Sequence, residues 1–271
     1  IGFLMFQFLL SGLRAGLRAR TIQSILVFGG LLMGVAYLSA SFSPRQPSTV
    51  ALDVGFSGLR ICLILFVISL VQELVGKEID RRTVMLSFAY PVSRAAYALG
   101  RYLGIISLAA LSAIMLSLLL LVVVMVVGGD YPSDFGMLLG LPFWAAVFGL
   151  WLDACVVAAF ALCIASLSTV SVLPLVLGLV FAVAGKSLGA VADYLGRGAD
   201  GDEALVQNFS GIVEMIFWVL PDLSRLDWRT WPMYGVAPES TTLVLSLAMA
   251  LAYVSTMLSL AVYVLKRREL T

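Results

Sequence analysis

Histidine is absent from the 271 residues, and cysteine occurs only three times. Without histidine, the chain lacks the imidazole of most zinc and haem sites and the base of Ser-His and Cys-His catalysis. The cysteines lie within apolar runs, at spacings that predict neither a disulfide framework nor a metal site. We therefore predict no metal site, no catalytic residue and no cofactor bound to this chain.

Charge is scarce as well. Only 12% of the residues are charged and 61% are hydrophobic, whereas a soluble domain carries about 25% charged residues. The mean hydropathy is +1.05. The net charge of +1 provides no basic surface for nucleic acid. The composition predicts an integral membrane protein whose surroundings are lipid, with no nucleic-acid partner.

Six apolar runs are each close to the ~20 residues that a helix needs to cross the hydrocarbon of a bilayer. They predict an all-α membrane protein, a single transmembrane domain over residues 1–271 with six spanning helices. The expected spans are 22–42, 54–75, 103–127, 142–167, 170–192 and 241–265.

The distribution of basic residues predicts the orientation. Eleven of the 17 lysines and arginines fall at one side if the N-terminus is cytoplasmic, in agreement with the positive-inside rule. An even number of spans then places both termini in the cytoplasm. If the first 20 residues form a helix, their apolar side chains lie on one face and their arginines on the opposite face. This pattern predicts an amphipathic helix in the membrane plane. The alternative is a cytosolic extension of the first span.

The longest charged stretch, 73–104, joins the second and third expected spans on the cytoplasmic side. A loop of this length is too long for a simple turn, so we expect it to contact something outside the membrane. Its middle, 83–90, is mostly apolar and needs a partner for one face. Pro91 ends that segment, and Ser93 is a suitable cap for the helix that follows.

This stretch resembles the first cytoplasmic loop of ABC-2 type exporter permeases, and in particular their multicopper-enzyme-maturation (NosY-like) branch. A usual glycine of that pattern is replaced here by Arg82. The matching positions are Glu73, Glu78, Arg82, Thr83, Pro91, Val92, Ser93, Arg94, Gly100 and Arg101. The resemblance implies that Glu73, Glu78, Arg82, Thr83, Pro91, Ser93, Arg94 and Arg101 couple the chain to an ATPase.

The resemblance also implies an architecture. The 83–94 segment would dock on a separate ATPase subunit, present in two copies, which would hold ATP and Mg. A second copy of this permease would complete a homodimer in the inner (cytoplasmic) membrane, and residues 1–20 would form the N-terminal elbow helix. The complex would export a compound or support maturation of an extracytoplasmic metalloenzyme, with a periplasmic accessory protein as a further partner.

The chain itself has no Gly-x-x-x-x-Gly-Lys-Ser/Thr sequence for binding nucleotide, so we expect it not to be an enzyme. Two other functions stay open. One is a gradient-driven secondary transporter, which needs ionisable residues near the middle of the membrane. The other is a membrane scaffold for a periplasmic partner. Co-purification with an ATPase distinguishes them from an exporter subunit.

Residues 193–240 form the longest expected extracytoplasmic piece. The run 208–220 is apolar but too short to span, and the tryptophans and tyrosine after it suit an interfacial belt. We expect a re-entrant or interfacial helix there. It would serve as an exit gate, as a dock for an extracytoplasmic partner, or as a lid that only packs.

Two charges fall inside spans. Asp153 lies near the middle of the fourth span, and Arg60 lies about two turns into the second. A charge at that depth costs ~2.5–3.5 kcal/mol on insertion scales, so it needs a partner. We predict that the two residues pair across the spans or line a polar vestibule between two protomers, as candidates for the transport pathway. The alternative is a structural ion pair that only holds the two helices together. Gly29, Gly30, Gly34, Gly149 and Gly178 are expected to allow close helix packing.

Overall fold

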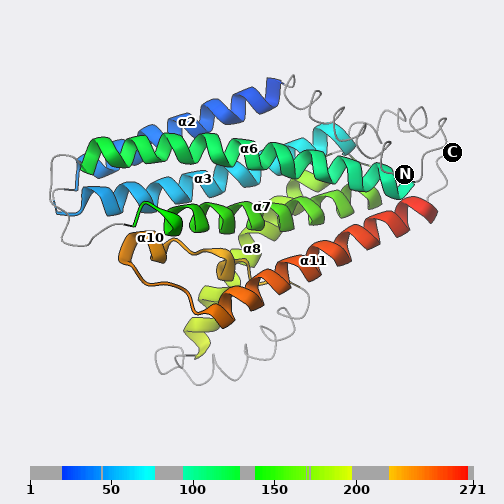
Figure 1. Cartoon of the computed structure of the whole chain (residues 1–271). Helices are drawn as coiled ribbons and strands as arrows, with labels where there is room; N and C mark the ends of the chain where they lie inside the picture. The colour runs from blue at the N-terminus through cyan, green and yellow to red at the C-terminus, as the bar shows by residue number, and fades with distance from the viewer. Residues whose placement is uncertain are drawn as a thin grey trace.

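The computed structural model describes residues 20–43, 45–76, 94–128, 138–168, 170, 172–196 and 220–267. Within them the chain is helical and contains no strand (Figure 1). The long helices are α2 (Arg20–Ser41), α3 (Pro47–Val71), α6 (Arg94–Gly128), α7 (Leu141–Leu167), α8 (Leu173–Gly196) and α11 (Ser240–Arg267). Three short helices are η1 (Gln72–Gly76), η3 (Leu223–Leu226) and α10 (Thr230–Tyr234).

Six of these helices are long and apolar enough to cross a membrane. The protein is therefore a multi-pass, all-α membrane protein, as the composition predicts. The helices alternate in direction, so the bundle has two ends. End I is where α2 begins and α11 ends, and end II is where α3, α7 and α11 begin.

Two expected span boundaries are wrong. The second spanning helix begins at Pro47 rather than 54, and the third begins at Arg94 rather than 103. A span predicted from hydropathy leaves out the polar residues at its ends, but these helices continue through such residues. Pro47 suits the first helical position. Arg60 consequently lies about three and a half turns into its helix, near its middle, and not two turns in.

The core is formed by α3 and α7. In the most apolar 18-residue stretch of each helix, 67% of α3 and 78% of α7 is buried inside the protein, compared with 11% of α11. The buried side chains of α7 include many small ones, so neighbouring helices approach it closely. In Figure 1 the axes of α3, α6 and α7 are nearly aligned, α2 is inclined to them and separates from them toward end I, and α8 and α11 diverge from them toward end II. That divergence leaves room for the chain between α8 and α11.

The 220–236 segment occupies that room at end II (Figure 1). It contains η3 and α10, and α10 ends at Tyr234 and is capped by Gly235, whose φ of 71° is left-handed. Glycine adopts this conformation without a Cβ clash. The extracytoplasmic piece 193–240 was expected to begin directly after the fifth span, but α8 continues to Gly196.

Several predictions lie outside the described residues. They are the amphipathic helix at 1–20, most of the loop at 73–104 and the apolar run at 208–220, which ends at the first described residue of the segment.

Candidate functional site: a buried charge cluster

The predicted pair of intramembrane charges is confirmed. Arg60 on α3 donates from Nε to Oδ2 of Asp153 on α7, with an N–O distance of 2.6 Å. The same guanidinium donates from Nη2 to the carbonyl oxygen of Ala182 on α8 at 3.4 Å. Arg60 thus joins three spanning helices through one side chain.

Asp153 is the more deeply buried partner, with 2% of its side chain exposed. Its second oxygen, Oδ1, has no hydrogen-bond partner among the described residues. An ion pair at this depth offsets much of the cost of burying either charge alone. A carboxylate can accept several hydrogen bonds, so this one retains unused acceptor capacity.

A second group of charges lies toward end II, centred on Asp227 beside η3. Lys186 of α8 forms a salt bridge to Oδ2 of Asp227. Arg229 pairs with the same carboxylate at 2.8 Å. Arg229 also reaches α3, where Nη1 lies 2.9 Å from Oδ1 of Asp53 and 2.8 Å from Oγ of Ser57. These contacts fasten the 220–236 segment to α3 and α8.

We call these six charged residues the charge cluster. It balances three acidic against three basic side chains: Asp53, Asp153, Asp227, Arg60, Lys186 and Arg229. The two groups act on each other, because the charges of Lys186 and Asp227 both influence the Asp153 carboxylate. Asp153, with 2% of its side chain exposed, depends most on keeping its partner, whereas Asp53 is 55% exposed and depends on its partner least.

Asp227 shows the effect of these partners on its ionisation. Burial alone would raise its pKa. The hydrogen bond from Arg229 and the charges of Lys186 and Arg229 outweigh burial, and the pKa of Asp227 is lowered below its ordinary value. The carboxylate is therefore ionised at neutral pH.

Three glycines form a seat for the segment. A Cβ at Gly149 of α7 would lie 2.3 Å from the carbonyl oxygen of Leu226. A Cβ at Gly185 of α8 would lie 2.7 Å from Cδ1 of Leu223. At Gly189, one turn further along α8, it would lie 2.0 Å from Oγ of Ser224. Only glycine permits this approach, so α7 and α8 are shaped for the segment.

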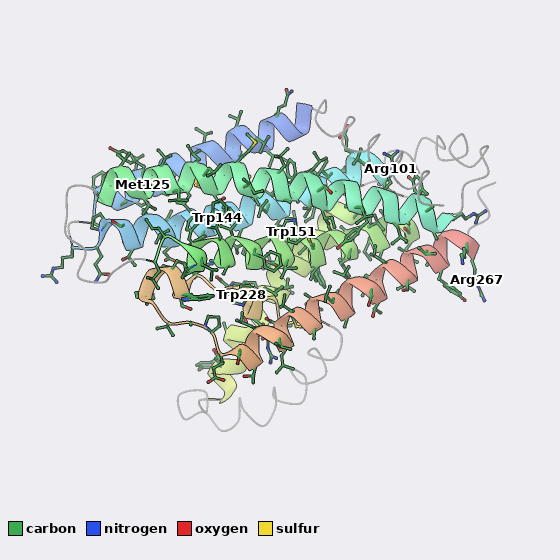
Figure 2. All side chains as sticks on the ribbon, viewed as in Figure 1. Arg101, Met125, Trp144, Trp151, Trp228 and Arg267 are labelled. Carbon is green, nitrogen blue, oxygen red and sulfur yellow. The ribbon has the colours of Figure 1, made fainter. Side chains whose placement is uncertain are left out.

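Apolar side chains fill the remaining contact. Leu223 is 1% exposed and Leu226 is fully buried. Trp228 is buried beside α7 (Figure 2) and lies 6.4 Å from the ring of Phe148, centroid to centroid. The apolar side chains of the 220–229 part are thus buried like those of a core element.

At end I, two of the predicted coupling residues lie near the start of α6. Arg94 is the first residue of α6 and donates from Nη1 to the carbonyl oxygens of Leu265 at 2.5 Å and Lys266 at 3.0 Å. These are last-turn carbonyls of α11, which otherwise lack helical partners. Arg101 is buried, with its guanidinium 5.7 Å from the ring centroid of Tyr97. Figure 2 shows Arg101 and Arg267 toward this same end.

Glu73 is half-buried in η1, a single π-helical turn that ends the α3 rod. Such turns are frequent at functional positions. The other predicted coupling residues lie outside the described part of the chain: Glu78, Arg82, Thr83, Pro91 and Ser93.

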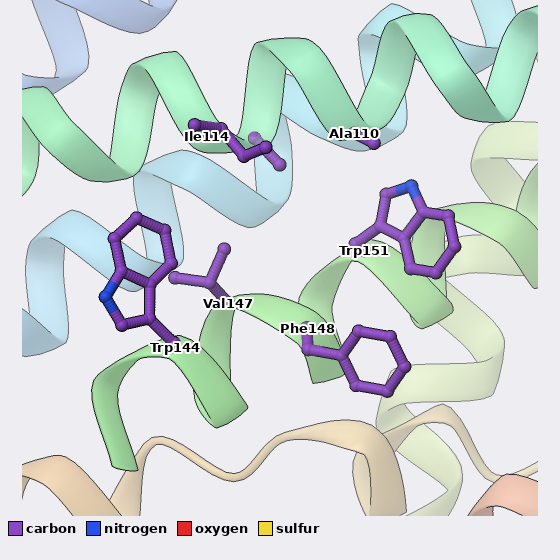
Figure 3. Close-up of a pocket in the computed structure, with 7 residues that line it drawn as sticks. Ala110, Ile114, Trp144, Val147, Phe148 and Trp151 are labelled. Carbon is purple, nitrogen blue, oxygen red and sulfur yellow. The ribbon is translucent and has the colours of Figure 1, made fainter. Parts of the chain in front are cut away.

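An apolar groove of about 310 Å³ lies between α6 and α7 (Figure 3). Ile114 of α6 faces Trp144 and Trp151 of α7 across it, and Phe148 lies between the two tryptophans. The indole nitrogen of Trp151 donates to the carbonyl oxygen of Ile106 at 3.0 Å. With no charged side chain in its lining, the groove offers no chemistry comparable to the charge cluster.

Sequence reasoning found one ion pair and missed the rest of the cluster. Lys186 is an isolated lysine in an apolar run, and this was a signal that it needs an acidic partner. Asp53 was missed because the second span was expected to begin after it. Asp227 and Arg229 stand close together in the sequence, but nothing there indicates which helix they contact.

Among the described residues no group of His, Cys, Asp and Glu is arranged to hold a metal ion. No protein-family model matches the chain, and no curated protein matches it.

Proposed function

We propose that the chain is the membrane subunit of an ATP-driven exporter, which works as a dimer and receives its energy from a separate ATPase. The observation that carries the proposal is the 73–104 stretch with its family-like pattern. The six-helix body and the π-helical turn at Glu73 agree with it. The π-helical turn lies where a force applied to the loop would enter the bundle.

The contacts of Arg94 give a mechanical reason for the pattern. Arg94 follows the 83–93 stretch directly and donates hydrogen bonds to carbonyl oxygens in the last turn of α11. A displacement of the loop would therefore move the start of α6 and the end of α11 together. Rigid movement of helices is a common way to switch a transporter between two states. In this proposal end I is cytoplasmic and end II faces the extracytoplasmic space.

A gradient-driven transporter is the second candidate, because the buried pair of Arg60 and Asp153 lies near the middle of two spanning helices. Such a transporter uses intramembrane ionisable groups to bind its coupling ion.

The deciding experiment purifies the tagged chain from the membranes of its native cells. An exporter subunit is expected to retain an ATPase of the P-loop class in equal amount, with ATP hydrolysis in the purified sample. The variant carrying Glu78→Ala and Pro91→Ala should lose that subunit. Arg45→Ala, a change at an exposed position near the start of α3, is the matched control and should keep it.

If the chain purifies without an ATPase and drives proton- or sodium-dependent uptake after reconstitution alone, the exporter proposal is wrong. The gradient-driven candidate then replaces it.

A further inference from the structure

Lys186 has a second acidic group within its neighbourhood. It follows Ala182 by four residues on the same face of α8, about 6 Å along the helix. The carbonyl oxygen of Ala182 accepts from Arg60, which is itself bound to Asp153. The backbone of Lys186 is therefore one helical turn from the Ala182 carbonyl, which Arg60 connects to Asp153.

Asp153 is equipped to receive a further donor. Its Oδ1 is buried and has no hydrogen-bond partner in the described part of the protein. A buried acceptor without a partner is costly, by ~1–3 kcal/mol. The positive charge of Lys186 already acts favourably on this carboxylate. A lysine ammonium is a compact charge on a flexible stem, and can move between two acceptors.

The present partner of Lys186, in contrast, does not belong to a spanning helix. Asp227 is on the 220–236 segment, which crosses no membrane and rests on the glycines of α7 and α8. If the segment moved away, Lys186 would lose its salt bridge while still on a spanning helix. An unpaired lysine there is unfavourable.

We propose that Lys186 is a two-position switch, which pairs with Asp227 when the 220–236 segment is seated and with Oδ1 of Asp153 when the segment has moved. The exchange keeps the lysine paired in both states, so it lowers the free energy needed to release the segment. The segment is thereby a gate at end II and not a fixed lid. The proposal stands on the charge cluster alone and is independent of the exporter assignment.

Arg229 supplies the comparison that a test needs. Like Lys186, it forms a salt bridge to Asp227. Its other partners, Asp53 and Ser57, lie on α3. Loss of Arg229 therefore weakens only the seated state. Loss of Lys186 weakens the seated state through Asp227 and the released state through Asp153, so the two effects oppose each other.

The test measures how often the segment opens. Cys62, Cys155 and Cys163 are replaced by alanine, and Leu223→Cys, at a position 1% exposed, is added as a probe. A polar maleimide is applied to the protein in detergent micelles, where both ends are accessible. Val236→Cys, at a position 63% exposed, is the control for the reagent. Size-exclusion chromatography confirms that each variant is folded.

Arg229→Gln should raise the labelling rate at least threefold over the unchanged cluster. Lys186→Gln should change it less than twofold, because both states lose a partner. Asp153→Asn should lower the rate at least threefold, because the released state loses its acceptor for the lysine.

A static clasp gives a different pattern. Lys186→Gln would then raise labelling at least twofold, because only the seated state loses a partner, and Asp153→Asn would raise labelling by loosening Arg60; either result overturns the switch. If Asp153→Asn does not yield folded protein, the comparison of Lys186→Gln with Arg229→Gln decides. Labelling of Leu223→Cys that never exceeds background, even with Arg229→Gln, also refutes the gate.

Discussion

Replacing Gly149 by alanine is the sharpest test of how the 220–236 segment is seated. The new Cβ would lie 2.3 Å from the carbonyl oxygen of Leu226 and 3.2 Å from Cε3 of Trp228. The first of these atoms is backbone, and Leu226 is fully buried. The clash cannot be relieved by rotating a side chain, so the segment itself has to shift.

Gly34→Ala is the matched control, because a Cβ there meets nothing within 4 Å. Both substitutions gain the ~0.5–1 kcal/mol by which alanine is favoured over glycine within a helix. Gly149→Ala additionally pays the cost of overpacking, ~1–3 kcal/mol. The free energies of unfolding of the two variants should therefore differ by that clash alone. Gly185→Ala should fall between them, because its closest contact is the side-chain atom Cδ1 of Leu223 at 2.7 Å.

The assay is thermal melting of the detergent-solubilised protein, followed by its helical circular dichroism. Since ~1 kcal/mol shifts the Tm of a domain of 150–250 residues by ~2–4 °C, the ~1–3 kcal/mol clash should make Gly149→Ala melt ~2–12 °C below Gly34→Ala. Equal melting temperatures for the two variants would refute the close packing of Leu226 against α7.

Three further predictions concern the charges. Replacing Asp153 alone by leucine should cost ~3–5 kcal/mol because it strands a buried Arg60, whereas adding Arg60→Met should recover most of that loss, as measured by melting; an additive double variant would contradict the pairing. Arg94→Ala should cost ~1.5–3 kcal/mol by removing charged hydrogen bonds to two last-turn carbonyls, and should speed amide exchange at both the start of α6 and the end of α11; a change confined to α6 would disprove the link. The folded pKa of Asp227 is lowered, so its stabilising contribution is complete above the unfolded value of about 3.9 and declines progressively as the pH falls from there through the lowered folded pKa. Between pH 6 and pH 3 the native protein should thus lose more Tm than Asp227→Asn does, and equal losses would show that Asp227 contributes nothing.

The general architecture could be read from the sequence because membrane spans depend on length and hydropathy alone. The pairing of Arg60 and Asp153 could be predicted for a related reason, since two charges within apolar runs need each other. The helix limits failed where polar residues continue a helix, as at Arg94 and Pro47. Polar residues can continue a helix, although they end the apolar run from which the span was predicted.

The glycines illustrate what sequence cannot resolve. Gly178 does pack against a neighbouring helix, because a Cβ added there would lie 3.2 Å from side-chain atoms of Ile68. At Gly149 the close neighbour is instead a backbone carbonyl of the 220–236 segment. At Gly30 and Gly34 an added Cβ would have no neighbouring atom within 4 Å. All four are similar in sequence context, and the distinction depends on which element is opposite. The same limit applies to Asp227, whose lysine partner lies 41 positions away.

The balance of the charge cluster has an electrical consequence. Moving one elementary charge through the full field of a membrane is worth ~2.3 kcal/mol per 100 mV. Asp227 and Arg229 carry opposite charges and lie on the same segment, so a displacement of that segment transfers almost no net charge. Only the short passage of the Lys186 ammonium between two carboxylates would do so. Opening at end II should therefore be nearly indifferent to membrane voltage.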